Sequence, residues 1–449
     1  MSGCLRYATG FSALAFASCL VLGASAANAA VVISTNPTSN ISCSSGVCTP
    51  SAAAAILNVN DLENDLVASS VKITTHGALA KDIHVSAALN WTSANTLTLD
   101  AYRSVAIYAP VADMGAGGLS LLTDDGGVDG TLSFGVKGNV TFLNTSDNLT
   151  INGTVYTLAD SVKTLANAID SNLAGSFALA NSYNAKPDGT YTQAPINYSF
   201  SGTFEGLGNT ISNLTISSST GAGLFRDLLP SATVRDLALK SAIVSAHRCC
   251  EAGVLVGDND GGYIIACYAS GRVYMDKYKS GGTAVAVGGL VGDSHNGAEI
   301  ADSVANVSVR EHGNSVAVGG LVGANDYSSV ILNSFAEGPV SVIATSGIAY
   351  VGGLVGSNDG GIEESYSSGA VSGGPNALVG GLVAKLGGDG GCQDSYWDTT
   401  TSGTGTSACG AGMTTAQLQT GLPPGFSSSI WAEAPMVIDG LPYLKDLPR

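Results

Sequence analysis

A repeated alternation of apolar and small polar residues, broken by doubled glycines, runs through the second half of the chain. The phrase Gly-Gly-Leu-Val-Gly and its close variants begin at Gly253, Gly288, Gly319, Gly352 and Gly380, and a degenerate copy covers 222–226. The leucines of successive copies lie 31, 35, 31, 33 and 28 residues apart. A period of this length indicates a chain built from stacked repeats, because one such unit cannot bury its apolar face alone.

Two further positions recur inside each repeat. A valine precedes the doubled glycine at Val287, Val318, Val351 and Val379. A serine follows an Asp, Asn or Glu at Ser303, Ser334, Ser365 and Ser395. Parallel coils in register would place these valines in one internal ladder and these serines in a second ladder at a turn. The glycines would allow sharp bends or close approach to the next coil.

The first half of the chain shows the same β-prone texture. The run Val71–Thr74 and the alternation over 96–99 predict early strands, and Val105 and Ile107 are expected on the inward face. A helical spacing then links Leu158, Val162, Leu165, Ile169 and Leu173. Thr157 is the expected N-cap and Gly175 the expected end of this helix, whose predicted role is to cover an edge or to connect two coil sections, ahead of binding a partner.

The C-terminal part changes texture again. Residues 399–412 are rich in Thr, Ser and Gly, and Thr414 or Thr415 could cap a short helical turn. The stretch 431–444 is apolar enough to close the open end of a stack. Such a cap is expected because an uncovered end of a β-solenoid is a template for aggregation.

Composition supports a β-rich exported protein. Only 12% of residues are charged, 59 are glycine and the formal net charge is −17. This acidic surface disfavours nucleic-acid binding.

The N-terminus predicts a signal peptide over 1–29, from Arg6, the apolar run 11–23 and the cleavage site Ala27-Asn28-Ala29. The alternative is a lipoprotein signal, in which Cys19 would be the acylated residue. No later apolar run reaches membrane-spanning length.

Seven cysteines follow the predicted signal. Cys43 and Cys48 could close one small loop, and Cys392 and Cys409 a second. The remaining three are Cys249, Cys250 and Cys267. With His247 they could form a zinc site, but vicinal cysteines do not match the usual ligand spacing, and a disulfide from Cys267 to one of the pair is favoured.

The repeated phrase resembles the GLUG repeat of large secreted bacterial proteins, including filamentous haemagglutinin-like adhesins and some immunoglobulin A-cleaving proteases. The stretch 200–216 is similar to the lead-in before such repeats, and 97–111 resembles the coil region nearer the N-terminus. The phrases at 396–398, 414–418 and 439–444 resemble those that close them. The resemblance implies a surface-associated exported protein and transfers no active site, because the motif is structural.

We therefore expect an all-β fold, a right-handed parallel β-helix (β-solenoid) with a short connecting helix and a C-terminal cap. The expected divisions are a signal peptide over 1–29, N-terminal coils over 30–156, a helical connector over 157–199, GLUG-type repeats over 200–400 and a cap or tail over 401–449.

Acidic turns are the first features to weigh for chemistry. They include 258–260, 325–326, 358–359 and Asp124-Asp125 with Asp129. Calcium could bind them, but they lack the patterns that supply six or more oxygen ligands, and Asn, Asp and Gly also simply form turns. The metal ligands are therefore left unassigned.

The sequence lacks two common catalytic patterns. The five histidines are His76, His84, His247, His295 and His312. They form no H-E-x-x-H pair, and no G-x-S-x-G elbow lies between a clear strand and helix. The expectation is a non-enzymatic, secreted or cell-surface adhesin-like solenoid without catalytic or cofactor-binding residues, which contacts host-cell, matrix or neighbouring-cell molecules. The alternative is a β-helical polysaccharide lyase or hydrolase. Tyr268, Phe335 and Tyr366 could form a ligand stripe, but packing inside the core is at least as good an interpretation.

Overall fold

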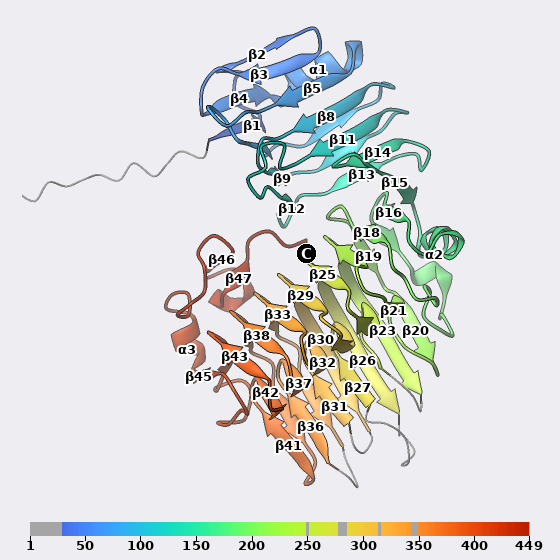
Figure 1. The fold of residues 1–449 in the computed structure, drawn as a ribbon, viewed down its shortest axis with the longest axis vertical. Coiled ribbons are helices and arrows are strands. Elements are labelled where there is room, and N and C mark those ends of the chain that lie inside the picture. The colour runs from blue at the N-terminus through green and yellow to red at the C-terminus, as the bar shows by residue number, and fades with distance from the viewer. Residues whose placement is uncertain (1–28, 248–250, 277–284, 313–315, 344–347, 449) are drawn as a thin grey trace, which may run out of the picture.

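The computed structural model describes residues 29–247, 251–276, 285–312, 316–343 and 348–448. Residues 1–28 of the expected signal peptide lie outside the described residues, and so do Cys249 and Cys250. Within the described residues nearly all of the regular secondary structure is β-strand, and the chain winds into two stacked sections that lie one after the other along the long axis (Figure 1).

One sheet of fifteen strands, here called the spine sheet, runs through both sections. In spatial order its strands are β2 (Ile41–Ser44), β3 (Val47–Pro50), β5 (Val71–Thr74), β8 (Thr96–Asp100), β11 (Gly118–Leu122), β14 (Asn148–Ile151), β15 (Thr154–Ala159), β16 (Ser176–Leu179), β18 (Thr203–Glu205), β22 (Thr233–Arg235), β25 (Tyr263–Ile265), β29 (Glu299–Ala301), β33 (Val330–Leu332), β38 (Gly361–Glu363) and β43 (Gly391–Gln393).

Two smaller parallel sheets complete the coils of the N-terminal section. The first contains β4 (Ala55–Asn58), β1 (Ala30–Ser34), β6 (Asp82–Val85), β9 (Val105–Ile107) and β12 (Leu132–Phe134), and the second β7 (Leu89–Trp91), β10 (Val111–Asp113) and β13 (Val140–Phe142). The predicted strands at 71–74 and 96–99 are confirmed, and Val105 and Ile107 are fully buried as expected. Helix α1 (Val59–Ala68), which the sequence analysis missed, packs Leu62 and Leu66 against this section.

Three further sheets complete the coils of the C-terminal section. The second sheet contains β17 (Tyr183–Asn184), β19 (Thr210–Ser212), β20 (Thr215–Ser218), β23 (Ala238–His247), β26 (Tyr268–Asp276), β30 (Val304–Glu311), β34 (Phe335–Ala336), β35 (Val340–Val342), β39 (Tyr366–Ser367), β40 (Val371–Gly373), β44 (Tyr396–Asp398) and β45 (Ala411–Met413). The third sheet contains β21 (Phe225–Leu228), β24 (Val256–Asp260), β28 (Val291–His295), β32 (Val322–Asn325), β37 (Val355–Asn358) and β42 (Val383–Leu386). The fourth sheet contains β27 (Val285–Gly288), β31 (Val316–Gly319), β36 (Ala349–Gly352) and β41 (Ala377–Gly380).

The two sections join at a hairpin. Strands β14 and β15 are antiparallel and turn at Asn152 and Gly153, both with positive φ, whereas β15 and β16 are parallel. On β16, Phe177 belongs to the core of the C-terminal section, and the adjacent Ala178 to the core of the N-terminal section. Neighbouring residues of a strand point to opposite faces, so the two cores lie on opposite faces of the spine sheet. Strand direction and core side therefore reverse together at this hairpin.

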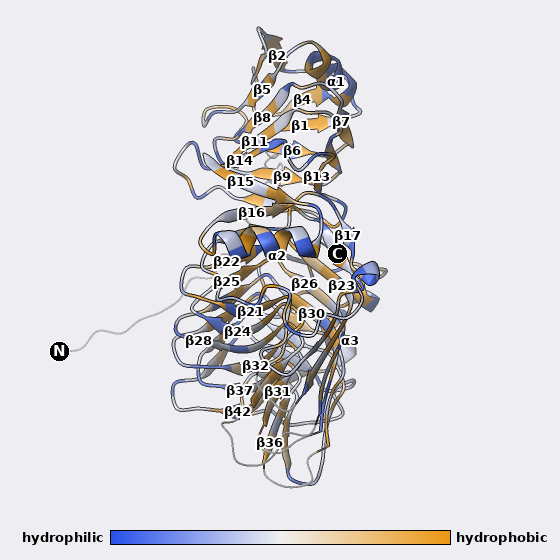
Figure 2. Cartoon of the chain, turned by 90° about the vertical axis from the view of Figure 1, so that its right-hand side faces the viewer, coloured by the Kyte–Doolittle hydropathy of each residue, from blue (hydrophilic) through white to orange (hydrophobic). Residues whose placement is uncertain are grey.

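Helix α2 (Val162–Ser171) covers this junction and lies between the two sections in Figure 2. Val162, Leu165 and Ile169 are buried, as the spacing predicted. The predicted N-cap is wrong, because Thr157 lies in β15 and Ser161 caps the helix in a capping box with Thr164. Leu158 belongs to the strand and faces the N-terminal core, so it only happened to match the helical spacing.

The valine ladder of the repeats is confirmed. Val287, Val318 and Val351 are paired in register in the fourth sheet and fully buried, and Val379 continues the row. The doubled glycines beside them are needed for close approach, since a Cβ on Gly320 would press against the backbone carbonyl of Gly353 on the next coil. Parallel pairing in register is thus what joins the repeats into one core.

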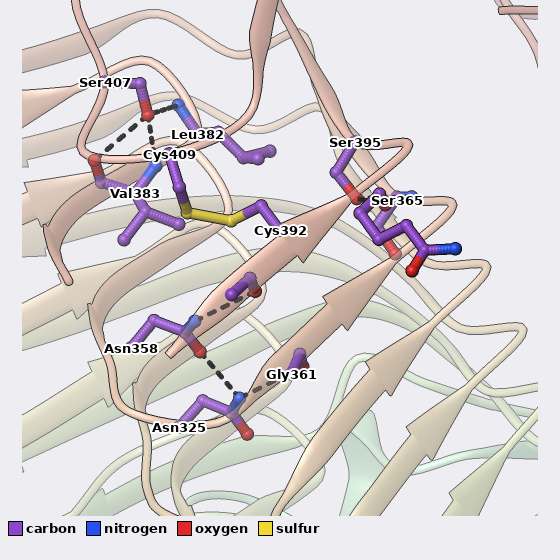
Figure 3. Close-up of a disulfide and its surroundings, with 12 residues drawn as sticks. Asn325, Asn358, Gly361, Ser365, Leu382, Val383, Cys392, Ser395, Ser407 and Cys409 are labelled. Carbon is purple, nitrogen blue, oxygen red and sulfur yellow. Dashed lines mark hydrogen bonds between the residues drawn. A yellow bond between two sulfur atoms is a disulfide. The ribbon is translucent and has the colours of Figure 1, made fainter. Parts of the chain in front are cut away.

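The serine ladder is also confirmed, and it has a hydrogen-bonding role. The backbone N–H of Ser303 donates to Ser334 Oγ at 3.1 Å, and the N–H of Ser334 donates to Ser365 Oγ at 3.0 Å. Each hydroxyl donates in turn to the carbonyl oxygen two residues earlier. The residue before each of these serines has a positive φ, a conformation that Asp302 and Asn333 adopt more readily than most residues, whereas Glu364 has no such preference. Ser365 and Ser395 are drawn in Figure 3.

The predicted disulfides Cys43–Cys48 and Cys392–Cys409 are both present, the latter near the last coil (Figure 3). The predicted disulfide of Cys267 is wrong, because Cys267 is a free, buried thiol. Burial raises its pKa above the ordinary range for a thiol.

The C-terminal tail follows a different path from the one expected. Helix α3 (Thr415–Leu418) begins after the Thr414 cap, as predicted. The short 3-10 helices η1 (Lys186–Asp188) and η2 (Ile438–Gly440) and the strand pair β46 (Trp431–Ala432) and β47 (Tyr443–Leu444) complete the structure. Trp431 and Leu444 pack on the outward row of Phe335 and Tyr366, so the tail covers a flank of the stack instead of its open end and returns towards the junction (Figure 1).

Candidate functional site

The outer face of the third sheet carries a row of carboxylates. Asp227, Asp258 and Asp293 are paired in register on β21, β24 and β28. The residues directly after them, Leu228, Asn259 and Ser294, are buried, so the alternation of the strands turns the aspartates outward. We call Asp227, Asp258, Asp260, Asp293 and His295 the acidic ledge.

His295 ties the ledge together. Its Nε2 lies 2.8 Å from Asp258 Oδ1, and its Nδ1 lies 3.6 Å from Asp260 Oδ1. Burial alone would lower the pKa of His295, but the neighbouring carboxylates, Asp258 first, raise it overall. The carboxylates therefore stabilise the protonated ring relative to a histidine in water.

Asp293 is the most perturbed carboxyl of the ledge. Burial, followed by repulsion from Asp326 and Asp258, raises its pKa to about 7. Its Oδ1 is buried without a hydrogen-bond partner among the described residues. A carboxyl in this position is costly to ionise and favours any cation that reaches it.

The donor atoms of Asp258, Asp293 and His295 all lie within 4.8 Å of one another. Once His295 releases its extra proton, one imidazole nitrogen with two carboxylate oxygens suits a divalent transition metal better than calcium, which prefers oxygen ligands alone. These residues fit such an ion, and they are the ones that would hold it.

The other acidic turns serve the fold. Asn325 and Asn358 are completely buried, and Asn325 Nδ2 donates to Asn358 Oδ1 at 2.7 Å, so they form an internal ladder (Figure 3). Asp124 adopts a positive φ, and its carboxylate accepts hydrogen bonds from the backbone N–H groups of Val128 and Gly130. These three residues support the turn interpretation.

Sequence reasoning named 258–260 but did not connect it with Asp293 and His295. The signal was present, since Val256-Gly257-Asp258 and Val291-Gly292-Asp293 occupy the same place in consecutive repeats. The aromatic stripe has a packing role, because the ring centroids of Phe335 and Tyr366 stack 4.8 Å apart beneath the tail. The zinc interpretation of His247 cannot be completed from the described residues, which exclude Cys249 and Cys250.

Comparison with known proteins gives a limited result. No family model matches the chain, and neither does any curated protein. Among solved structures, the chain is similar to a Bacteroides ovatus protein provisionally named an immunoglobulin A1 protease, with 17% identity and a TM-score of 0.47 over 65% of this chain and 92% of that one. It is also similar to a structure named IgA1 Protease, with 21% identity and a TM-score of 0.36 over 52% of this chain and 19% of that one.

These names contradict one expectation. The sequence analysis predicted that the chain is not an enzyme, whereas both of these structures carry the names of proteases. That prediction is wrong as stated and is withdrawn. Their low identities and TM-scores assign no activity to this chain. Within the part of the chain that the structure describes, no helix has the length and apolar character needed to cross a membrane.

Proposed function

We propose that the chain is an exported, right-handed β-solenoid of the adhesin kind that attaches to host-cell, matrix or neighbouring-cell surface molecules through its acidic ledge. Export rests on the signal-like segment at 1–29. The resemblance of the repeats to GLUG-containing adhesins supports the attachment role.

The observation that carries the proposal is the in-register row of Asp227, Asp258 and Asp293. Strands in a sheet lie about 4.8 Å apart, so a rigid stack presents these carboxylates at a fixed spacing without any cost of ordering a loop. Such a row attracts basic groups on a surface, either directly or through a bound divalent cation. The net charge of −17 adds long-range attraction to the same partners.

Attachment of the purified mature chain to immobilised cells and matrix proteins tests the proposal. The double variant Asp258→Asn/Asp293→Asn should weaken attachment about 10-fold, a change of about 1.4 kcal/mol. The control Asp170→Asn/Glu363→Gln removes two exposed acids elsewhere and should leave attachment within about 2-fold. Equal attachment by both double variants would exclude the ledge as the contact surface.

A further inference from the structure

Three polar side chains on the outer face of the second sheet form a directional chain of hydrogen bonds. Ser217 Oγ lies 2.9 Å from His247 Nε2, and His247 Nδ1 lies 2.9 Å from Asp276 Oδ2. The order is hydroxyl, imidazole and carboxylate, with each ring nitrogen used once. This arrangement is separate from the acidic ledge, which lies on the third sheet.

The fold brings the three residues together from adjacent coils. Strand β20 pairs with β23, and β23 pairs with β26, so Ser217, His247 and Asp276 come from three neighbouring strands. His247 and Asp276 are paired directly in register. Each occupies an outward position, because the residues before them, Ala246 and Met275, are buried.

The carboxylate determines the state of the ring. A hydrogen bond from the Tyr274 hydroxyl, followed by the contact with His247, lowers the pKa of Asp276 below its ordinary value. An ionised Asp276 can only accept, so His247 Nδ1 carries the proton and Nε2 of the neutral ring accepts from Ser217. The serine hydroxyl thus faces a base that another residue holds in the required tautomer.

The site is open to solvent. The side chains of His247 and Asp276 are 39% and 46% exposed, and Ser217 is partly buried on the same face. A serine on an open face with an oriented base fits an ester whose acyl group stands out from a larger molecule. Amide cleavage asks more of a site, because the amine leaving group must be protonated and the oxyanion strongly stabilised.

We propose that Ser217, His247 and Asp276 form an acyl-transfer site that hydrolyses accessible carboxylic esters, such as O-acyl groups on extracellular polymers. Ser217 Oγ bonds to the ester carbonyl carbon while its proton passes to His247 Nε2. The alkoxy group leaves as an alcohol with that proton. Water then attacks the acyl-serine and gives one proton to His247, which returns it to Ser217 Oγ as the carboxylic acid departs.

Two measurements on the mature chain test this proposal. The first is hydrolysis of p-nitrophenyl acetate. The second is mass spectrometry after treatment with a fluorophosphonate, in which the Ser217 oxygen bonds to phosphorus and fluoride leaves. We expect modification on the peptide that contains Ser217 and hydrolysis above the buffer rate. Ser217→Ala and His247→Ala should each reduce that hydrolysis about 100-fold, because general-base assistance is worth ~10²- to 10⁴-fold.

Ser245→Ala is the matched control, since Ser245 is paired in register beside Ser217 on the same outward face. It should keep both activities, and circular dichroism should show that all variants are folded. Equal fluorophosphonate modification of the wild type and of His247→Ala, or no modification of Ser217 in the wild type, would overturn the proposal. Failure of cell attachment in the ledge variants bears only on the proposed function, because those variants leave this site intact.

Asp276 is a positioning residue, and its test is spectroscopic. In the wild type, ¹⁵N nuclear magnetic resonance should show the proton of neutral His247 on Nδ1. Asp276→Asn should lose this preference and the hydrolysis together, and Asp276→Glu should recover part of both. An unchanged tautomer in Asp276→Asn would remove Asp276 from the site.

Discussion

The side-chain amide of Asn325 donates a hydrogen bond of 2.7 Å to the side-chain oxygen of Asn358 on the next coil, and neither residue is exposed to solvent. Asn358 Nδ2 donates onward to the carbonyl oxygen of Gly360 at 2.9 Å. The turn between the third sheet and the spine sheet is therefore held from inside by side chains that repeat with the coil. Buried polar groups of this kind are stable only while each keeps its partner.

We expect Asn358→Ala to reduce the free energy of unfolding by about 1–3 kcal/mol, because Asn325 Nδ2 and the Gly360 carbonyl each lose a buried partner. Asn306→Ala on the exposed face of β30 is the control and should change stability by less than about 0.5 kcal/mol. Urea unfolding followed by circular dichroism compares the two. Equal stability of both variants would show that the ladder is not buried.

The doubled glycines give a sharper contrast. Gly320→Ala should prevent stable folding of the repeats, because its Cβ would overlap the Gly353 carbonyl and the Ala336 side chain. Gly391→Ala meets no atom within 4 Å and should be tolerated. Soluble yield and the thermal midpoint measure the difference, and a Gly320→Ala variant as stable as Gly391→Ala would contradict the close stacking.

The stacking was predictable because its cause is local and repeated. A ladder is predicted because valine recurs at one place in each repeat, at Val287, Val318 and Val351. The helix boundary was not predictable from spacing alone, because Leu158 satisfies the helical pattern yet lies in a strand that serves a different core. The sequence of the hairpin at Asn152 and Gly153 predicts a turn, but it does not predict that the core moves to the opposite face of the spine sheet there.

The sequence also did not predict that the tail covers the outward aromatic row. The sequence shows that Phe335 and Tyr366 are apolar and periodic, but the segment that covers them lies far along the chain. The candidate site was predicted only in part, because the sequence analysis named Asp258 as an acidic turn residue. Its link with His295 depends on which strands lie side by side, and only the register supplies that information.

The acidic ledge should make stability depend on pH. The pKa of Asp293 rises from 3.8 to about 7 on folding. The contribution of Asp293 to stability is therefore fully present below about pH 4, falls as the pH rises towards 7, and is lost above that value. In the presence of a chelator, Asp293→Asn should remove this decline and stabilise the protein at pH 8 by at most about 4 kcal/mol. Thermal midpoints between pH 4 and 8 provide the check, and parallel profiles for both proteins would contradict the assignment.

The tail should contribute directly to stability. Trp431 is completely buried and contacts Phe335, Tyr366 and Phe426, whereas Met436 is 98% exposed. Trp431→Ala should cost about 3–5 kcal/mol and increase the binding of an apolar dye as the aromatic row is uncovered. Met436→Ala should do neither. Unchanged dye binding by Trp431→Ala would mean that the tail does not lie on this flank in solution.

The central claim is that the repeats stack along one axis in register. It is tested most directly by electron–electron distances between spin labels on genetically encoded ketone residues, which leave the native cysteines untouched. Thr203, Tyr263 and Gly391 occupy one row of the spine sheet, with Tyr263 four strand steps and Thr203 six steps from Gly391. At about 4.8 Å a step, we expect narrow distributions at ~19 Å and ~29 Å for these two pairs. Broad distributions, or distances that do not increase with the number of steps, would contradict it.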